Sequence, residues 1–382
     1  MKAIAITSKG IEDICSKEIE ELIKAKTETK ESCVIFEPKK VEDLCLLCYK
    51  AQSVDKILFL FNSFSFNEKS FFNDLKKIID KIDFSKWLDK DMKFMVSCKK
   101  DNDHLSTEEV CSKTGELIID KIKEKEKYNQ KVDLNNPDLI IFVYIVGNNC
   151  YLGIDFSGFD LHKRSHKIFV HSSSLRGTIA YALVRIADFK EKETLLDAFT
   201  GSGTIPIEAA LYTSNFPVNY FNKDKFSFLR FKDKINPKKI FSEADKKIKT
   251  TKSKIYGYDS VLGYVTNSKK NAKIAGINKQ INFSRIDIEW LDTKFDKESI
   301  DKIVANPPNT RSINQKEIEK VYNEFFYQAE FVLKKTGKIV LISTEKSLEF
   351  LKKYAEKYKF KLKEERVVYS GKAPLKVAVF SK

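Results

Sequence analysis

A chain of 382 residues is longer than one hydrophobic core usually supports, so we expect two or three domains. With 42% hydrophobic and 32% charged residues the composition is that of a globular protein, and no stretch approaches the run of about 18 apolar residues that a membrane helix needs. The formal net charge of +15 favours a polyanionic partner, nucleic acid or an anionic membrane surface, although a general excess of lysine would give the same value.

The start of the chain and its cysteines indicate a reducing compartment. The first residues contain no long apolar stretch followed by a cleavage site, so we expect no signal peptide. The seven cysteines are an odd number and none lies beyond Cys150, which argues against a disulfide framework. Cys45 and Cys48 form a lone CxxC pair, which we interpret as buried thiols rather than half of a zinc site. We therefore expect a cytoplasmic protein without a metal.

The N-terminal half reads as mixed α/β structure. Residues 1–60 alternate short strands and amphipathic helices. Residues 93–100 predict a strand, and residues 106–125 predict a helix with Ser106 as N-cap and Glu109 completing a capping box. Residues 138–158 predict two strands joined by a turn at Gly147.

The C-terminal half reads as strands alternating with helices. A helix over 174–189 precedes a strand, a glycine loop and a second helix over 194–212. Further strands are expected at 254–259, 281–287, 301–308 and 337–343, with helices at 262–276 and 317–335 between them. This alternation predicts an α/β fold with a mostly parallel, doubly wound sheet, in which ligands bind beyond the carboxyl ends of the strands.

The first of these strand ends carries the loop from Asp197 to Thr204, with Gly201, Ser202 and Gly203 at its centre. The glycines let the backbone approach a ligand closely and present N–H groups to it. Pro206 stands where the dinucleotide fingerprint has a third glycine, and the loop lacks the Gly-Lys of a nucleotide-triphosphate loop. A carboxylate at Asp197 would repel a pyrophosphate but suits a ligand with an ammonium group, such as S-adenosylmethionine. A turn that serves packing alone is the alternative.

Two more strand ends carry acidic residues. Asp259 ends the second strand, where a carboxylate commonly accepts both ribose hydroxyls. Asp287 ends the third strand and could accept from an adenine amino group. Each alone could be a simple turn former, so their weight comes from their order in the chain.

The fourth strand ends in the most specific motif, Asn306-Pro307-Pro308-Asn309. The two prolines fix the backbone and remove its donors, which leaves the Asn306 amide oxygen and the Pro307 carbonyl as acceptors. Two acceptors match the two N–H groups of an exocyclic base amine, and holding both aims the nitrogen lone pair at a methyl donor without a metal or a strong base. An ordinary loop after a strand is the alternative.

Taken in order, these segments resemble the class I RNA methyltransferases of the guanine-N2 type, a family once described as adenine-specific DNA methylases. The matching segments are 172–187, 195–211, 256–259, 285–287 and 304–309, with 156–166 similar to the family's connector. Residues 96–110 give the best match to a THUMP RNA-binding domain. The resemblance implies a ferredoxin-like domain over 1–62, a THUMP domain over 63–158, a connector over 159–173 and a Rossmann-like methyltransferase domain over 174–382.

The resemblance also implies roles for single residues. Asp197, Gly201 and Gly203, with Ser202 and Thr204 beside them, would line the methionine part of S-adenosylmethionine, and Asn306 with Pro307 would hold the target amine. Asp259 would bind the ribose and Asp287 the adenine. In members of the family, the carboxylate of the cofactor lies near the positions that are occupied in this chain by Ser174, Arg176 and Thr178. The family has an aromatic residue where this chain has Asn309, so either another aromatic, Tyr322 or Phe325, stacks on the base, or the activity or the choice of base has changed.

The expected partner is RNA, most readily tRNA, with ribosomal RNA as the alternative. The candidate phosphate contacts are basic residues of the THUMP-like segment and the connector, and ordinary solvated surface is the competing interpretation. These residues are Lys99, Lys100, His104, Lys163 and Arg164. Two further hypotheses stay open: an RNA-binding protein that has lost catalysis, which Asn309 motivates, and a DNA adenine methyltransferase.

Overall fold

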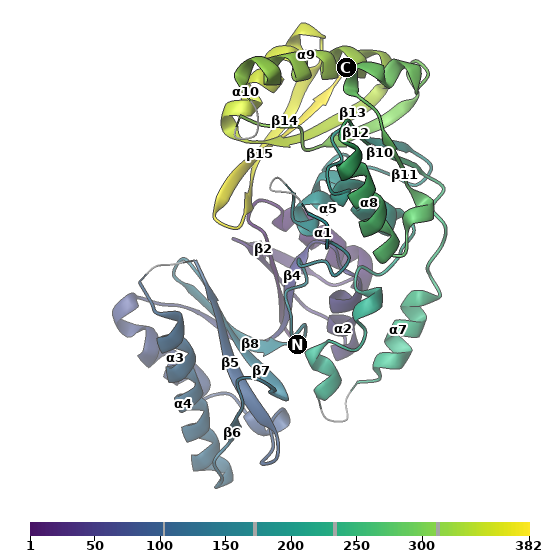
Figure 1. Ribbon diagram of the computed structural model, residues 1–382. Coiled ribbons are helices and arrows are strands. Elements are labelled where there is room, and N and C mark those ends of the chain that lie inside the picture. Colours follow the sequence, from purple (N-terminus) through teal and green to yellow (C-terminus); the bar gives the residue numbers. More distant parts are fainter. Residues whose placement is uncertain (102–103, 171–173, 232–234, 311–313) are drawn as a thin grey trace. The chain divides into compact units, whose positions relative to one another are not determined.

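A computed structural model describes residues 1–101, 104–170, 174–231, 235–310 and 314–382 (Figure 1). The chain divides into two compact units. The first contains Met1–Thr7, Ser16–Leu161 and Asn222–Glu243, and the second contains Ser8–Cys15, His162–Phe221 and Ala244–Lys382. No helix in these ranges is long and apolar enough to cross a membrane.

The N-terminal half forms one sheet of eight strands in the order β2-β3-β1-β4-β8-β7-β5-β6. The strands are β1 (Ala3–Thr7), β2 (Thr27–Lys30), β3 (Cys33–Phe36), β4 (Val54–Ser65), β5 (Lys93–Lys100), β6 (Lys131–Val132), β7 (Leu139–Val146) and β8 (Asn149–Asp155). The helices are α1 (Glu12–Ile23), α2 (Val41–Lys50), α3 (Phe71–Ile79) and α4 (Thr107–Glu126), with short 3-10 turns at Glu68–Ser70 and Phe84–Lys86.

Strand β4 joins the two domains that the sequence predicts in this half. It pairs with β1 on one side and with β8 on the other, so the expected boundary between residues 62 and 63 falls inside a strand. Ile4 and Leu58 share a buried cluster with Tyr144 and Tyr151. The ferredoxin-like and THUMP-like segments thus share one sheet and one core.

Two local predictions in this half are confirmed. The Ser106 hydroxyl accepts a hydrogen bond from the Glu109 N–H at 3.3 Å, so Ser106 is the N-cap of α4 as predicted. The hydroxyl donates to the Glu108 carboxylate, and the return bond from Ser106 N–H to Glu109 that would complete the capping box stays a prediction. Cys45 and Cys48 are both 0% exposed thiols that are not in a disulfide, as expected of core residues.

The second unit is built on a sheet of seven strands in the order β11-β10-β9-β12-β13-β15-β14. The strands are β9 (Thr194–Asp197), β10 (Lys254–Asp259), β11 (Asn282–Arg285), β12 (Ile300–Ala305), β13 (Leu333–Ser343), β14 (Lys361–Ser370) and β15 (Ala373–Ser381). The helices are α5 (Gly177–Ile186), α6 (Thr204–Thr213), α7 (Pro237–Asp245), α8 (Leu262–Ile274), α9 (Gln315–Val332) and α10 (Glu345–Lys357). Short 3-10 turns lie at Tyr220–Asn222, Ser227–Arg230, Asn278–Gln280 and Ile288–Thr293.

The first five strands of this sheet are parallel, whereas β15 runs antiparallel to both of its neighbours. The predicted doubly wound α/β sheet is therefore confirmed. The antiparallel pair β14–β15 extends it beyond the elements that the sequence pattern predicts. The strand order reverses at β9, which is the place where such sheets bind ligands.

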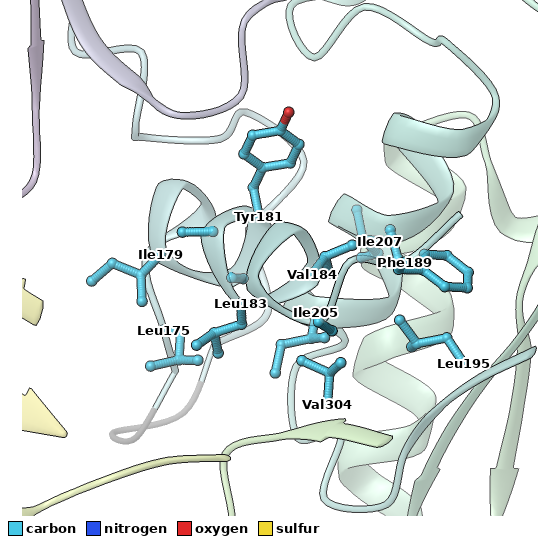
Figure 2. Close-up of a cluster of buried hydrophobic side chains, with 14 of the residues drawn as sticks. Leu175, Ile179, Tyr181, Leu183, Val184, Phe189, Leu195, Ile205, Ile207 and Val304 are labelled. Carbon is cyan, nitrogen blue, oxygen red and sulfur yellow. The ribbon is translucent and has the colours of Figure 1, made fainter. Parts of the chain in front are cut away.

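Alternating side chains bury both faces of this sheet. Leu195 and Val304 point to the face covered by α5 and α6, and Figure 2 shows them with Ile179, Leu183 and Ile205 in one cluster. Their neighbours in the strands, such as Leu196 and Ile303, point to the other face and pack against α9 and α10. Because helices cover both faces of the sheet, a ligand can reach it at the ends of the strands.

The long insert between β9 and β10 divides between the two units. Phe226 and Phe228 are each 1% exposed and stack with ring centroids 4.9 Å apart, and the Ser227 hydroxyl donates to the Asp155 carbonyl. These aromatic rings are therefore core residues of the unit that contains the N-terminal half. Residues 232–234 of the insert lie outside the described part of the chain.

Candidate active site

Three strand ends meet at one edge of the second sheet. Asp197 ends β9, Asp259 ends β10, and Asn306 directly follows β12. Strand β9 pairs in parallel with both neighbours, with Leu196 opposite Tyr256 on one side and Ile303 on the other. Because the strands run in the same direction, their carboxyl ends lie side by side at the point where the strand order reverses.

A small cavity of about 30 Å³ opens at this edge. It gathers five residues that the sequence singles out from separate segments: Ser174, Asp197, Ser202, Thr204 and Asn306. It is also lined by four residues that the sequence analysis did not select: Leu175, Phe199, Thr200 and Ile205. Ligand pockets usually hold about 300–1,000 Å³, so this cavity can enclose only part of a nucleoside-sized ligand.

The glycine loop is held against Asp259. Gly201 and Gly203 have φ angles of 51° and 80°, which favour glycine. The Gly201 N–H donates to one Asp259 carboxylate oxygen at 2.9 Å, and the Val261 N–H donates to the other at 3.0 Å. These two bonds fix the plane of the carboxylate, whose oxygens are acceptors of the kind to which hydroxyl groups donate.

Two buried polar residues of α8 support the loop from behind, and the sequence analysis missed both. The Ser268 hydroxyl donates to the Gly201 carbonyl at 2.8 Å. The Asn271 amide donates to the Ser202 carbonyl at 2.9 Å and to the Phe169 carbonyl at 2.8 Å, which ties the connector to the loop. Polar residues on the inner face of the helix after Asp259 were the signal that could have revealed them.

Asp197 is the most electrostatically perturbed group of the site. Burial raises the pKa of its carboxyl well above the usual range. A hydrogen bond of 3.1 Å from the Phe199 N–H to this carboxylate lowers the pKa, whereas the negative charge of the nearby Asp259 carboxylate raises it further. A buried carboxylate without a cationic partner is unfavourable, so the site favours a positively charged ligand. Hydroxyl groups lie beside it: Ser174 Oγ is 2.6 Å from Ser202 Oγ, which is 3.1 Å from Thr204 Oγ1.

The diproline turn is anchored from two sides. The Tyr322 hydroxyl donates to the Pro308 carbonyl at 2.6 Å, and the Thr310 N–H donates to Ser347 Oγ at 3.1 Å. Burial raises the pKa of Tyr322 to about 12, so the hydroxyl stays a donor. The Pro308 carbonyl is thereby engaged, and the turn is held in one position beside Asn306.

The expectation that Tyr322 or Phe325 stacks on the target base is wrong. The two side chains are 0% and 1% exposed, and Phe325 packs against Phe199 with ring centroids 5.6 Å apart. Their period on α9 places them on the face that covers the sheet. Asn309 is half-buried in the turn.

Three other predicted cofactor residues do not line the cavity. Arg176 is the half-buried N-cap of α5, and Thr178 is buried in the first turn of that helix with a hydroxyl that makes no hydrogen bond. Asp287 is exposed and precedes the turn Ile288–Thr293.

The basic residues predicted to contact RNA phosphates differ in their exposure and in their neighbours. Lys99 is half exposed and its ammonium group lies 3.2 Å from an Asp55 oxygen. Lys100 is half-buried and Lys163 is exposed. His104 is 68% exposed and lies 3.3 Å from Glu68. The connector residue His171 lies outside the described part of the chain.

Arg164 does not have the exposed position that a phosphate contact needs. Its side chain is 0% exposed and donates from Nε to Glu208 Oε1 at 2.7 Å and from a terminal nitrogen to Oε2 at 3.1 Å. A side chain on Gly177 would place its Cβ only 2.5 Å from Arg164 Nε. The guanidinium therefore forms a buried ion pair that links the connector to α6. The expectation that Arg164 contacts an RNA phosphate is wrong.

Among the described residues there is no cluster of three or more histidine, cysteine or acidic side chains that could hold a metal ion. The site consists of carboxylates, hydroxyl groups and amide or carbonyl acceptors. Such a set can bind a cationic ligand and orient an amine.

Comparisons with known proteins agree with this geometry. Residues 164–374 match the family described as the RMKL-like methyltransferase domain, and residues 69–155 match the THUMP domain. The tRNA (guanine(6)-N2)-methyltransferase of Methanocaldococcus jannaschii is 32% identical over 305 residues, which cover 78% of each chain. The protein of the same description from Archaeoglobus fulgidus is 28% identical over 98% of this chain and 91% of its own. The structure of a methyltransferase complexed with SAH covers 100% of this chain and 97% of its own with a TM-score of 0.82 at 20% identity, a likeness of fold.

Proposed function

This chain belongs to the RMKL-like methyltransferase family and carries a THUMP domain, and we propose that it methylates the N2 amine of a guanine in tRNA. It is an S-adenosylmethionine-dependent RNA methyltransferase of the guanine-N2 type. The choice of tRNA rests on the two relatives described as tRNA methyltransferases, which align with most of this chain.

The observation that carries the proposal is the convergence of Asp197, Ser202 and Asn306 on one cavity. A glycine loop alone would fit several nucleotides, and a diproline turn alone would be a loop. Together they support a site in which a cation-favouring carboxylate shares a cavity with Asn306, the first residue of the diproline turn. This combination suits transfer of a methyl group from a sulfonium to a nitrogen.

The residues present fit S-adenosylmethionine. Asp197 is a buried carboxylate whose raised pKa calls for a positive charge, and the Thr178 hydroxyl is buried without a partner. We assign Asp197 and the 201–204 loop to the methionine part, Asp259 to the ribose and Asp287 to the adenine. The cofactor supplies an electrophilic methyl group when it is bound.

The chain's own contribution to catalysis is positioning. The Asn306 amide oxygen and the Pro307 carbonyl would accept the two N–H bonds of the guanine amine, which turns the nitrogen lone pair toward the methyl carbon. The cofactor would supply the methyl group and keep the electron pair of its carbon–sulfur bond, and the methylated amine would lose one proton to water. Such orientation replaces a strong base as the source of rate.

Variants at Asn306 test these roles. Asn306→Ala removes the side-chain acceptor and should lower kcat by about 100- to 1,000-fold, as the loss of one preorganised catalytic group does. Asn306→Asp keeps an acceptor oxygen of the same reach and should retain more activity than the alanine variant. Equal activities of wild type and Asn306→Ala would refute the assignment.

The RNA class is tested by offering unfractionated tRNA and ribosomal RNA separately with labelled S-adenosylmethionine. We expect label in tRNA, recovered as N2-methylguanosine. Label in ribosomal RNA alone would refute the choice of tRNA while leaving the reaction type intact.

A further inference from the structure

A groove in the second unit lies apart from the cavity at the catalytic edge. It has a volume of about 770 Å³ and runs between α8 and the outer strands β10 and β11. Its lining includes Ile255 of β10 and Phe283 of β11, and it shares no lining residue with the cavity beside Asn306. The groove therefore does not belong to the cavity formed at the strand ends.

The walls of this groove are basic. Five lysines line it: Lys254, Lys269, Lys270, Lys273 and Lys279. No carboxylate is among its lining residues, and the sequence from Ser260 to Ile286 contains no aspartate or glutamate. Asn278 and Asn282 add neutral amide donors. Such a surface attracts anions and offers nothing to repel them.

The positive charge of these five lysines is not neutralised within the described part of the chain. Among the described residues none of the five forms an ion pair, and Lys270 instead lies 4.8 Å from the Phe169 ring centroid. On α10, by contrast, Lys352 contacts Glu365 and Lys353 contacts Glu319.

Lys269 and Lys273 also stand one helical turn apart, where like charges destabilise a helix. The groove thus concentrates positive charge that the protein itself does not neutralise. An external polyanion would relieve this repulsion.

The groove is mechanically linked to the catalytic edge through α8. The inner face of this helix supports the glycine loop through Ser268 and Asn271, while its outer face carries the lysines. From Leu262 to Lys269 the helix rises by roughly 10 Å, so the groove begins within a few nucleotides of the strand ends. A strand of RNA that leaves the site along α8 would enter the groove.

We propose that this groove, which we call the α8 groove, binds the phosphate backbone of the RNA substrate away from the methylated nucleotide. The proposal rests on the proposed function, since it takes RNA as the substrate. It adds a second RNA-binding surface, on the catalytic unit itself, to the THUMP domain. Its role is affinity and not chemistry, because no lysine of the groove lines the cavity with Asn306.

The test is the triple variant Lys269→Gln, Lys273→Gln and Lys279→Gln in the full-length chain. Binding of unfractionated tRNA is measured by fluorescence anisotropy from 50 to 300 mM salt, with the range chosen around physiological ionic strength (about 150 mM). If each lysine contacts one phosphate, the slope of log Kd against log salt should fall by about 2 to 3 and Kd should rise roughly 10- to 100-fold. Activity at saturating RNA and affinity for S-adenosylmethionine should stay at the wild-type values.

The matched control is Lys352→Gln, Lys353→Gln and Lys357→Gln on α10, which changes the net charge by the same amount. We expect it to bind tRNA within about twofold of wild type. Equal losses in the two triple variants would show a general charge effect and overturn the proposal. The proposal would also be overturned if the groove variant bound tRNA with wild-type affinity but no longer bound vesicles of anionic phospholipid. Absence of methyl transfer by the wild type would instead refute the proposed function.

Discussion

Replacing Arg164 by methionine would separate the two interpretations of this residue. The structure buries both side chains of the Arg164–Glu208 pair at 0% exposure and joins them by contacts of 2.7 and 3.1 Å. Removing one partner leaves a charge in the core, which costs about 3–5 kcal/mol. A domain is usually stable by only about 5–15 kcal/mol, so Arg164→Met should remove a large part of the stability of its unit.

Urea unfolding followed by circular dichroism measures this loss. The double variant Arg164→Met with Glu208→Leu should regain most of the stability, because it leaves no unpaired charge. Gly177→Ala should destabilise in the same direction, since its Cβ would lie 2.5 Å from Arg164 Nε. If Arg164→Met unfolds with a free energy within about 1 kcal/mol of the wild-type value, as surface substitutions usually do, and binds RNA more weakly, the structural role is refuted. Arg164 would then be a phosphate contact, as the sequence predicts.

Three further predictions concern the site and its surroundings. Tyr322→Phe removes the 2.6 Å hydrogen bond to the Pro308 carbonyl, so kcat should fall by about tenfold with little change in the KM for S-adenosylmethionine, and an unchanged kcat would contradict the anchoring role. Because the pKa of Asp197 is raised, its ionised form, which a cationic cofactor prefers, becomes populated as pH increases. Titration calorimetry should therefore show S-adenosylmethionine affinity rising with pH in the wild type. Asp197→Asn should bind more weakly and without that pH dependence; the same pH dependence in both proteins would exclude Asp197 as its cause. Burial and the neighbouring charges of Arg164 and Lys167 lower the pKa of His166 from 6.5 to about 3, so between these values the unfolded chain holds a proton that the folded chain does not. Stability should thus fall by about 1.4 kcal/mol per pH unit as pH decreases through that range, and His166→Asn should flatten a plot of unfolding free energy against pH.

The sequence predicts the catalytic unit well because its pattern is local. Asp197, Asp259 and Asn306 each end a strongly apolar strand, and parallel strands bring their carboxyl ends to one edge. The strand order of the sheet was not deducible from the pattern. The hairpin of β14 and β15 was not predicted either, because β14 is mostly exposed and rich in charged residues.

The remaining errors come from long-range contacts that a pattern does not reveal. Arg164 looks like surface in a basic connector, yet its partner Glu208 lies 44 positions away in the chain. The sequence leaves Tyr322 available for stacking on a base, but α9 packs against the sheet and the Tyr322 hydroxyl donates to the Pro308 carbonyl. The expected boundary at residue 62 falls inside β4, which pairs with β1 on one side and with β8 on the other, and a sequence pattern does not reveal such strand pairing.

The identity of the methylated nucleoside tests the central claim most directly. RNA incubated with the full-length chain and S-adenosylmethionine would be digested to nucleosides and resolved by mass spectrometry. A cation-favouring carboxylate beside acceptors for both N–H groups of a guanine amine predicts N2-methylguanosine, absent when Asn306 is alanine. A product methylated at a ring nitrogen or on the ribose, or the same yield from the alanine variant, would contradict it.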